Sequence, residues 1–249
     1  MNNLNFEKED LILKKLICAV DTANIDDAID ITKSLKGIAG FKVGLEFFSA
    51  NGPHGVKKIQ ENISNSFIFL DLKLHDIPNT VAGAVSSAIS SIKPYMLTIH
   101  SSGGLKMMQE AIKAAVDASN KAGCPVPKML AVTILTSMDE SDLDFVYSSR
   151  DISSKVRKLA NMACKIGFNG IVCSANEIKI LREDLGPEVM LVTPGIRPTW
   201  HTSDDQKRTM GPGEAIKNGA DYLVIGRAIT SAKDRQLALK KVVEEIKGM

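Results

Sequence analysis

Acidic and basic side chains alternate inside an apolar segment near residue 70 of this 249-residue chain. Asp71 and Lys73 are separated by one leucine, and Asp76 follows three residues later. Because side chains alternate along a β-strand, we expect Asp71 and Lys73 on one side and the leucines around them on the other. An ammonium group held beside a carboxylate can stabilise developing negative charge and deliver a proton. Taken alone, the pair would equally suit a structural ion pair.

A second lysine strengthens the catalytic interpretation. Lys42 lies in the preceding apolar run, and Asp21 ends the run before that. Two ammonium groups and two carboxylates at the mouth of one cavity can form an alternating network, in which each charge fixes the protonation state of its neighbours. Adjacent inward-facing lysines are rarely needed for stability alone, because buried charge is costly. The predicted catalytic residues are therefore Lys42, Asp71, Lys73 and Asp76.

An anion site is predicted toward the end of the chain. The apolar run 222–225 is followed by Gly226 and Arg227, and an earlier run leads through Pro194 to Arg197. A glycine lets a backbone N–H approach an anion closely, and an arginine offers a charged fork. Barrels often bind phosphate with the loops after strands seven and eight together with a helix N-terminus. Two ordinary strand-to-helix turns are the alternative.

Eight short apolar runs supply the elements that must position these side chains. Runs that are apolar throughout are typical of parallel strands buried on both faces. Their alternation with amphipathic segments over about 250 residues favours a single-domain (β/α)8 TIM barrel, with an open doubly wound sheet as the alternative. The runs are Leu16–Val20, Phe41–Gly44, Phe67–Leu72, Tyr95–Ile99, Met129–Ile134, Gly170–Cys173, Val189–Val192 and Tyr222–Ile225.

The segments between the runs have the apolar spacing of helices. We expect helices at Ile25–Leu35, Leu105–Val116, Ile152–Ile166 and Leu237–Ile246, and a helical turn beginning at Pro78. Residues 1–249 are expected to form one domain, with residues 1–15 as an N-terminal helical extension. The longest polar interruptions, 137–151 and 197–211, directly follow predicted strands, which places them among the catalytic loops of a barrel.

Composition excludes several classes of protein. Hydrophobic residues make up 44% and charged residues 24%, as in folded globular domains, and 31 basic against 29 acidic residues give a net charge of only +2. We therefore expect neither a nucleic-acid nor a membrane partner. Lys14 and Lys15 interrupt the first apolar stretch, which argues against a signal peptide, and the four cysteines form no C-x-x-C pair. We therefore expect a cytoplasmic protein.

The histidines lack the spacing of metal ligands, so we expect no metal site.

The motifs together resemble orotidine 5′-monophosphate decarboxylase of the bacterial type. The resemblance runs from about Leu16 to the last helix, with its motifs in order and on the expected strands. Two aspartates and a lysine spaced D-x-K-x-x-D mark the wider superfamily, whereas their conjunction with Lys42, Gln206 and the Gly226-Arg227 pair is specific. The matching motifs are residues 41–44, 71–80, 135–137, 193–198, 205–208 and 225–227.

The resemblance implies decarboxylation of orotidine 5′-monophosphate to uridine 5′-monophosphate, the last step of pyrimidine synthesis, with no metal or cofactor. Lys73 would donate the proton to C6 of the pyrimidine, and Asp71 would lie against the departing carboxylate. The enzyme would be a homodimer in which Asp76 and Thr80 reach the partner's site. Ribose would contact Asp21, Lys42 and Asp76. The implied substrate-binding residues are Asp21, Lys42, Asp71, Lys73, Asp76, Ile77, Thr80, Thr136 and Ser137 near the pyrimidine and ribose, Pro194, and Arg197, Gln206, Gly226 and Arg227 around the phosphate.

Three other functions fit parts of the pattern. Magnesium-dependent sugar-phosphate decarboxylases and aldolases share D-x-K-x-x-D, but typically carry a carboxylate where this chain has Lys42. A Schiff-base aldolase would need Lys73 unprotonated, which the neighbouring aspartates oppose. A non-catalytic nucleotide-binding protein would leave the clustered charges unexplained. One departure from the family pattern is Gly211 before Pro212, where Thr-Pro is common; glycine can also cap a helix, so we expect a local change at the base of the loop.

Overall fold

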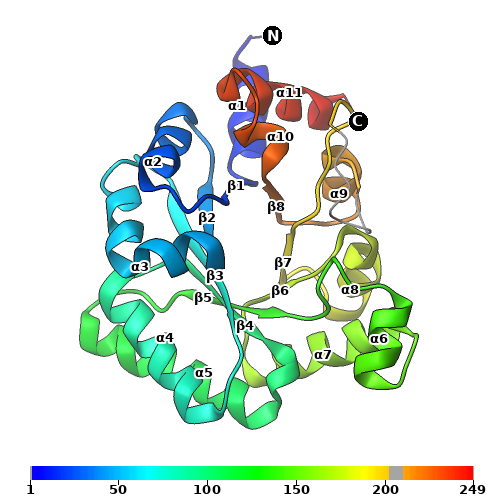
Figure 1. Ribbon diagram of the computed structural model, residues 1–249. Coiled ribbons are helices and arrows are strands. Elements are labelled where there is room, and N and C mark those ends of the chain that lie inside the picture. The colour runs from blue at the N-terminus through cyan, green and yellow to red at the C-terminus, as the bar shows by residue number, and fades with distance from the viewer. Residues whose placement is uncertain (1, 202–209, 249) are drawn as a thin grey trace.

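The computed structural model describes residues 2–201 and 210–248. Within these ranges, eight parallel strands close into a barrel in the order of the sequence, with β1 paired to both β2 and β8 (Figure 1). The predicted (β/α)8 TIM barrel is confirmed, and the alternative of an open doubly wound sheet is wrong because β8 closes on β1. The strands are β1 Leu16–Val20, β2 Gly40–Gly44, β3 Phe67–Leu74, β4 Met96–His100, β5 Lys128–Val132, β6 Gly170–Val172, β7 Met190–Thr193 and β8 Tyr222–Ile225.

Helices surround the barrel and agree with the expected segments. The helix predicted at Ile152–Ile166 has these bounds in the structure, and Pro78 begins a helix as predicted, because its fixed φ suits the first turn. The helices are α1 Asn2–Leu13, α2 Ile25–Ser34, α3 Leu45–Gln60, α4 Pro78–Ile92, α5 Leu105–Ala122, α6 Glu140–Tyr147, α7 Ile152–Ile166, α8 Ile178–Leu185, α9 Pro212–Lys217, α10 Arg227–Thr230 and α11 Arg235–Lys247, with short 3₁₀ turns at Ser101–Gly103 and Ala175–Glu177.

The polar segment after β5 is not a plain loop, because α6 lies within it. Asp139 caps this helix by accepting hydrogen bonds from the backbone N–H groups of Ser141 and Asp142, and the Asp142 carboxylate accepts one from the Asp139 backbone N–H. Hydrophobic periodicity does not reveal the helix, since Phe145 is 93% exposed and the only deeply buried side chain of α6 is Leu143.

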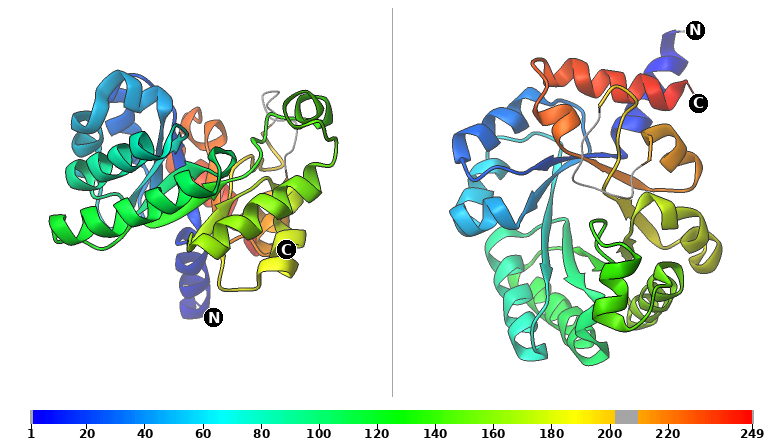
Figure 2. Two further views of the ribbon diagram at one scale, coloured as in Figure 1. Left: turned by 90° about the horizontal axis from the view of Figure 1, so that it is seen from below. Right: turned by 45° about the vertical axis from the view of Figure 1, so that its right-hand side comes forward.

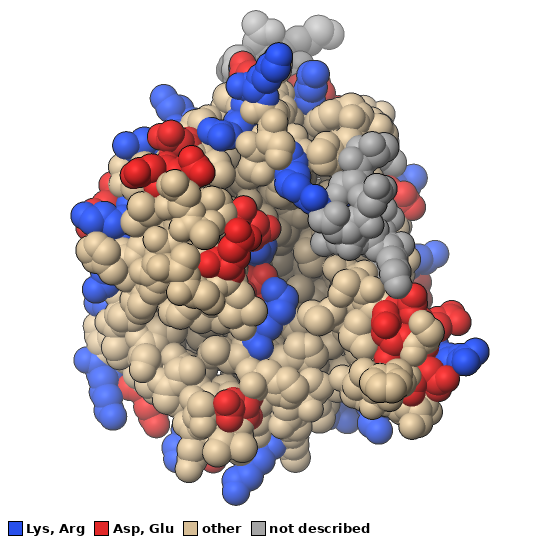
Figure 3. All heavy atoms as spheres, in the orientation of Figure 1, with Lys and Arg blue, Asp and Glu red and all other residues tan. Residues whose placement is uncertain are grey.

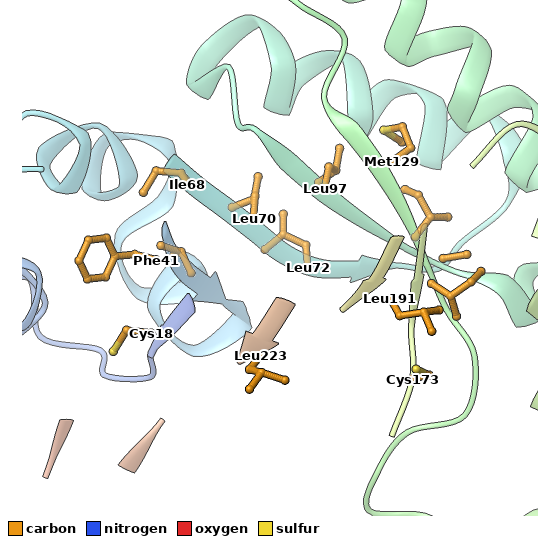
Figure 4. Close-up of a cluster of buried hydrophobic side chains, with 14 of the residues drawn as sticks. Cys18, Phe41, Ile68, Leu70, Leu72, Leu97, Met129, Cys173, Leu191 and Leu223 are labelled. Atoms are coloured by element: carbon orange, nitrogen blue, oxygen red, sulfur yellow. The ribbon is translucent and has the colours of Figure 1, made fainter. Parts of the chain in front are cut away.

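The alternation of strand side chains divides the hydrophobic residues into two layers. Side chains such as Phe41, Leu70 and Leu97 leave the strands outward and pack beneath the helices (Figure 4). Others, such as Phe69 and Val224, point inward and fill the barrel. The large outward cluster supplies most of the buried apolar area and hence most of the hydrophobic stabilisation of the fold.

The two ends of the barrel differ in chemistry. At the end where the strands begin, the Phe67 ring packs against Tyr95 and Tyr222, with ring centroids 4.5 Å and 5.9 Å apart. At the opposite end, the inward positions of β2 and β3 carry Lys42 and Asp71 instead of apolar residues. An aromatic plug therefore closes one end, and charged side chains occupy the other.

The first and last helices lie together outside the barrel. Helix α1 contacts α11, and Lys247 Nζ lies 3.1 Å from Glu9 Oε2, so that both chain ends emerge on the same side (Figures 1 and 2). No helix in the described part of the chain is both long enough and apolar enough to cross a membrane. The four cysteines are unpaired, and burial raises the pKa of the Cys18 thiol to about 12.

Candidate active site

A cavity of about 470 Å³ opens at the carboxyl ends of the barrel strands. Figure 3 shows basic and acidic side chains around a hollow in the middle of this face. The volume is in the range of small-molecule sites, and the location is where barrels carry catalytic residues. Its lining comprises Ala19, Asp21, Lys42, Glu46, Phe69, Asp71, Lys73, Thr136, Val172, Pro194, Gly195, Arg197, Val224, Gly226, Arg227 and Thr230.

Four charged side chains form an alternating row along one wall of the cavity. Lys42 Nζ lies 3.0 Å from Asp21 Oδ1 and 3.6 Å from Asp71 Oδ2, and Lys73 Nζ donates to the same Asp71 oxygen at 2.7 Å. The order is thus Asp21, Lys42, Asp71, Lys73, contributed by the ends of β1, β2 and β3. The inner members, Lys42 and Asp71, are 12% and 7% exposed, whereas Asp21 and Lys73 at the two ends are 55% and 32% exposed. Of the two ammonium groups that line the cavity, that of Lys73 is therefore the more exposed, with Asp71 fixed behind it.

The row keeps its buried members charged. Burial opposes ionisation of Asp71, but Lys42 and Lys73, with hydrogen bonds from Lys73 and Thr98, hold the pKa of its carboxyl below the usual value. Burial likewise opposes the charge on Lys42, yet Asp71 and Asp21 raise the pKa of its ammonium group. Each carboxylate compensates the desolvation of a lysine, which makes the row an interdependent unit.

A glycine and a strained backbone conformation help to place the two lysine side chains. A Cβ atom on Gly44 would lie 3.1 Å from Lys42 Nζ, so the glycine that ends β2 leaves space for the ammonium group. Lys73 has φ of +46°, in the left-handed region that is uncommon for a residue other than glycine. The regular pairing of β3 with β4 is interrupted between Leu70 and Leu74, where this residue lies. The strain is thus stored at the lysine that faces the cavity.

The opposite wall gathers the residues predicted to hold an anion. Gly226 and Arg227 at the end of β8 line the cavity together with Pro194 and Arg197 beyond β7. The loop after β7 is closed at its base, because the Arg197 N–H donates to the Met210 carbonyl at 2.9 Å. Gln206, also assigned to the phosphate, lies outside the described residues. The two guanidinium groups are therefore carried by neighbouring strands across the cavity from Asp71.

Gly211 lies at the base of this loop. It is the N-cap of α9, and Pro212 stands in the first turn of that helix. Nearby, Glu245 of α11 accepts hydrogen bonds from the backbone N–H and hydroxyl of Thr199, at 3.1 Å and 3.2 Å. The segment leading into the loop is thereby fixed to the last helix.

Not every residue proposed from the sequence lines this cavity. Thr136 does, but Asp76, Ile77, Thr80 and Ser137 do not, and all four are exposed. The Asp76 carboxylate accepts a hydrogen bond from the Ile77 N–H at 2.6 Å, so within one chain it does not complete the row of charges. Within one chain, these four residues therefore lie on the rim and not in the lining of the cavity.

Further residues of the site were not predicted from the sequence. Glu46 and Thr230 line the cavity. Thr98, fully buried on β4, donates its hydroxyl to Asp71 Oδ1 at 3.0 Å. Strand alternation contains the signal for Thr98, because it is the polar member of an apolar run at an inward position.

A pair of histidines stands beside the row. His75 and His100 stack with ring centroids 5.3 Å apart. Burial, together with His75 and Lys73, lowers the pKa of His100 to about 4, so its ring is neutral at pH 7. His100 Nδ1 lies 2.6 Å from the Ser102 hydroxyl. Among the described residues there is no group of three or more His, Cys, Asp or Glu side chains arranged to hold a metal ion.

Known proteins are similar to this chain in sequence and in fold. The family model described as "Orotidine 5′-phosphate decarboxylase / HUMPS family" matches residues 14–242. Orotidine 5′-phosphate decarboxylase of Rhodospirillum rubrum is 46% identical over 231 residues, covering 92% of this chain and 93% of that protein. The protein of the same name from Idiomarina loihiensis is 44% identical over 238 residues, covering 95% and 99%. The crystal structure of orotidine 5′-phosphate decarboxylase from Lactobacillus acidophilus superposes with a TM-score of 0.77 at 34% identity, covering 93% of this chain and 98% of that one.

Proposed function

This chain belongs to the orotidine 5′-phosphate decarboxylase / HUMPS family, and from that premise we propose that it decarboxylates orotidine 5′-monophosphate (OMP) to uridine 5′-monophosphate (UMP) with Lys73 as the proton donor. This activity is the one in the names of its relatives and makes the chain a carboxy-lyase of pyrimidine biosynthesis. The observation that carries the mechanism is the row of four charges that ends at the Lys73 ammonium group in the cavity.

The reaction breaks the bond between C6 of the pyrimidine and its carboxylate carbon. The electron pair of that bond stays on C6, and CO₂ leaves. Negative charge therefore moves from the carboxylate onto carbon, and an ammonium group fixed beside C6 gains attraction as the charge arrives. Lys73 Nζ then transfers one proton to C6, which yields UMP and a neutral amine that regains its proton from solvent.

Asp71 holds the proton donor in place for this step. Its Oδ2 atom lies 2.7 Å from Lys73 Nζ and also faces Lys42. Because the carboxylate is nearly inaccessible to solvent, its field is weakly screened, and the ammonium group is oriented before substrate arrives. A fixed charge of this kind costs no reorganisation at the moment when C6 becomes negative.

Beyond the ribose, which would contact Asp21 and Lys42, the substrate would lie along the floor and the opposite wall of the cavity. Phe69, Val172 and Val224 give the floor an apolar surface. Arg197 and Arg227 would bind the phosphate as charged forks. Since the phosphate is remote from the bond that breaks, its binding energy can hold the pyrimidine against Lys73.

We also propose that the active form is a homodimer in which Asp76 and Thr80 reach the site of the partner subunit. The rim that carries them has an apolar character unusual for a free surface: Ile77 is 66% exposed, Leu45 56% and Leu105 53%. These residues stand at the starts of α4, α3 and α5, which follow three adjacent strands. A second copy covering this arc would bury it and bring Asp76 to a neighbouring cavity.

Lys42 distinguishes this proposal from metal-dependent chemistry in the same superfamily. A magnesium ion needs oxygen ligands, and the place between Asp21 and Asp71 is taken by the Lys42 ammonium group, which would repel the ion. The Schiff-base alternative is disfavoured because Lys73 Nζ is held in an ion pair with Asp71 at 2.7 Å and is not free to attack a carbonyl group.

Loss of OMP absorbance, followed with the purified protein in excess EDTA, tests the proposed function. We expect stoichiometric formation of UMP and CO₂ at the same rate with and without the chelator. Loss of activity in EDTA that magnesium restores would favour the metal-dependent alternative, and tight UMP binding without turnover would favour a nucleotide-binding protein. Borohydride trapping with a keto-sugar phosphate would add mass only to a Schiff-base enzyme.

Three expectations from the sequence stay predictions. They are the cytoplasmic location, the lack of nucleic-acid and membrane partners, and the assignment of residues 1–15 as a helical extension of a single domain spanning residues 1–249.

A further inference from the structure

Thr98 lies at the point where β4 meets the catalytic end of β3. It is fully buried and points into the barrel, between the outward-facing Leu97 and Ile99. Its hydroxyl makes two hydrogen bonds at once: it donates to Asp71 Oδ1 at 3.0 Å and accepts from the Lys73 backbone N–H at 2.8 Å. One hydroxyl thus connects the carboxylate behind the proton donor with the backbone of the proton donor itself.

The backbone at Lys73 needs this partner. The residue has φ of +46°, and the regular pairing of β3 with β4 is interrupted around it. Within that interruption the Thr98 hydroxyl accepts the hydrogen bond from the Lys73 N–H. A left-handed conformation at a residue with a long side chain persists only where the surroundings determine it. The hydroxyl therefore helps to hold the conformation that sends the lysine side chain into the cavity.

The Asp71 carboxylate is likewise fixed from two sides. Its Oδ2 atom faces the ammonium groups of Lys73 and Lys42, and its Oδ1 atom receives the Thr98 hydroxyl. The terminal torsion of an aspartate is broad, so contacts at one oxygen alone leave the carboxylate free to rotate. The hydrogen bond at Oδ1 removes that freedom and sets the direction from which Lys73 is held.

We infer that Thr98 is a positioning residue for decarboxylation, which acts through Asp71 and Lys73 without touching the substrate. The inference rests on the proposed function. Because the hydroxyl orients the proton donor, its loss should slow the chemical step. It should leave nucleotide binding intact, because Arg197 and Arg227, which would hold the phosphate, lie on the other wall.

The test compares two substitutions at Thr98 with one control. Thr98→Val keeps the shape but removes the hydroxyl, and we expect kcat for OMP to fall about 10- to 100-fold, the effect of losing a hydrogen bond to a charged group. The Kd for UMP should stay within about twofold. Thr98→Ser restores the hydroxyl and should recover kcat to within about threefold of the unsubstituted enzyme.

Thr133→Val is the matched control. Thr133 is also fully buried, and its hydroxyl donates to the Val172 carbonyl at 3.3 Å, away from the row of charges. Both valine variants thus lose one buried hydroxyl group, which makes two hydrogen bonds at Thr98 and one at Thr133, but only Thr98→Val affects the row. We expect kcat of Thr133→Val to stay within about twofold of the unsubstituted enzyme when the assay temperature lies well below the Tm of every variant.

Several results would overturn the inference. They are an unchanged kcat in Thr98→Val, an equal loss in Thr133→Val, a parallel loss of UMP affinity, or a folded Thr98→Ser that is as slow as the valine variant. If Thr98→Val does not fold, Thr98→Cys replaces it, because a thiol is a weak donor and acceptor, and a kcat equal to that of Thr98→Ser then contradicts the inference. Absence of turnover in the unsubstituted enzyme would instead contradict the proposed function.

Discussion

Asp71 is shared by two lysines, and this sharing explains how charge is kept at the end of a hydrophobic barrel. Lys42 has a second partner in Asp21, whereas Lys73 reaches into the cavity with Asp71 behind it. The burial of Asp71 would favour its neutral form, but the two ammonium groups lower the pKa of its carboxyl. Lys73, the proposed proton donor, is consequently the most exposed of the three groups and the best placed to contact a substrate.

Arg227 permits a prediction about binding energy. Arg227→Ala removes a charged fork from the proposed phosphate site, and we expect KM for OMP to rise about 10- to 100-fold, while kcat at saturation changes less. Initial rates over a wide range of OMP concentration separate the two parameters. Arg150→Ala is a suitable control, since Arg150 is 73% exposed and pairs with Asp144 on the surface. An unchanged KM in Arg227→Ala would remove the phosphate assignment.

Residue types and strand periodicity were enough to predict the convergence of Asp21, Lys42, Asp71 and Lys73, because side chains two apart on a strand share a face and parallel strands end at the same edge. Thr98 was not predicted, although it is the polar member of an apolar run, because its two hydrogen bonds depend on the irregular pairing of β3 with β4 and on the left-handed backbone at Lys73. Strand alternation indicates an inward polar position but not the side chain that this position holds.

The strands bring the site together, and their close approach constrains which residues they can contain. Strand β6, Gly170–Val172, lies between β5 and β7 and has the shortest span of the barrel strands in the described chain. A Cβ atom on Gly170 would lie 2.4 Å from the Met190 carbonyl oxygen and 3.0 Å from Leu130 Cδ2. The first of these contacts is with backbone, so no side-chain movement relieves it.

Gly170→Ala is therefore predicted to lower the free energy of unfolding by about 1–3 kcal/mol. Urea unfolding followed by circular dichroism measures the change. Gly211→Ala provides the contrast, because a Cβ there would meet only Glu245 Oε1 at 3.5 Å and φ is −68°. It should change stability by less than about 1 kcal/mol, because the lower entropy of the unfolded chain is opposed by the weaker N-cap preference of alanine. Equal effects of the two substitutions would show that β6 and β7 are not held this closely.

At the scale of elements, apolar runs and turn residues predicted most of the fold. The bounds of β1, β8 and α7 coincide with the predicted segments, because each is bounded by polar or turn-forming residues. The prediction of β3 ended two residues early, since the chain continues past Leu72 through a strained lysine. Helix α6 went unrecognised because its exposed face carries hydrophobic residues, which reverses the usual pattern.

The cavity and the exposed apolar rim lie on the same face of the barrel. The row of four charges lies inside one chain, while Asp76 and Thr80 remain on the rim with the exposed Ile77. In the proposed dimer, each copy would contribute Asp76 and Thr80 to the cavity of the other. Stability of the assembly and completeness of the active site would then depend on the same contact.

Mixing two inactive variants tests this arrangement. Lys73→Ala and Asp76→Ala should each be inactive alone, whereas heterodimers formed on mixing contain one site with an intact lysine and an intact partner aspartate. With random reassortment, activity should recover to roughly a quarter of that of the unsubstituted enzyme per site. Recovery should follow the rate of subunit exchange. If Asp76 acted within its own chain, no activity would return.

The kcat of Lys73→Ala at saturating OMP is the measurement that tests the central claim most directly, with the Kd for UMP determined on the same sample. Loss of the ammonium group beside C6 removes both the attraction for the forming carbanion and the proton donor. We predict that turnover falls by at least about 10⁴-fold, while affinity for UMP stays within about tenfold. A folded Lys73→Ala protein that still decarboxylates OMP at a rate near that of the unsubstituted enzyme would contradict the account.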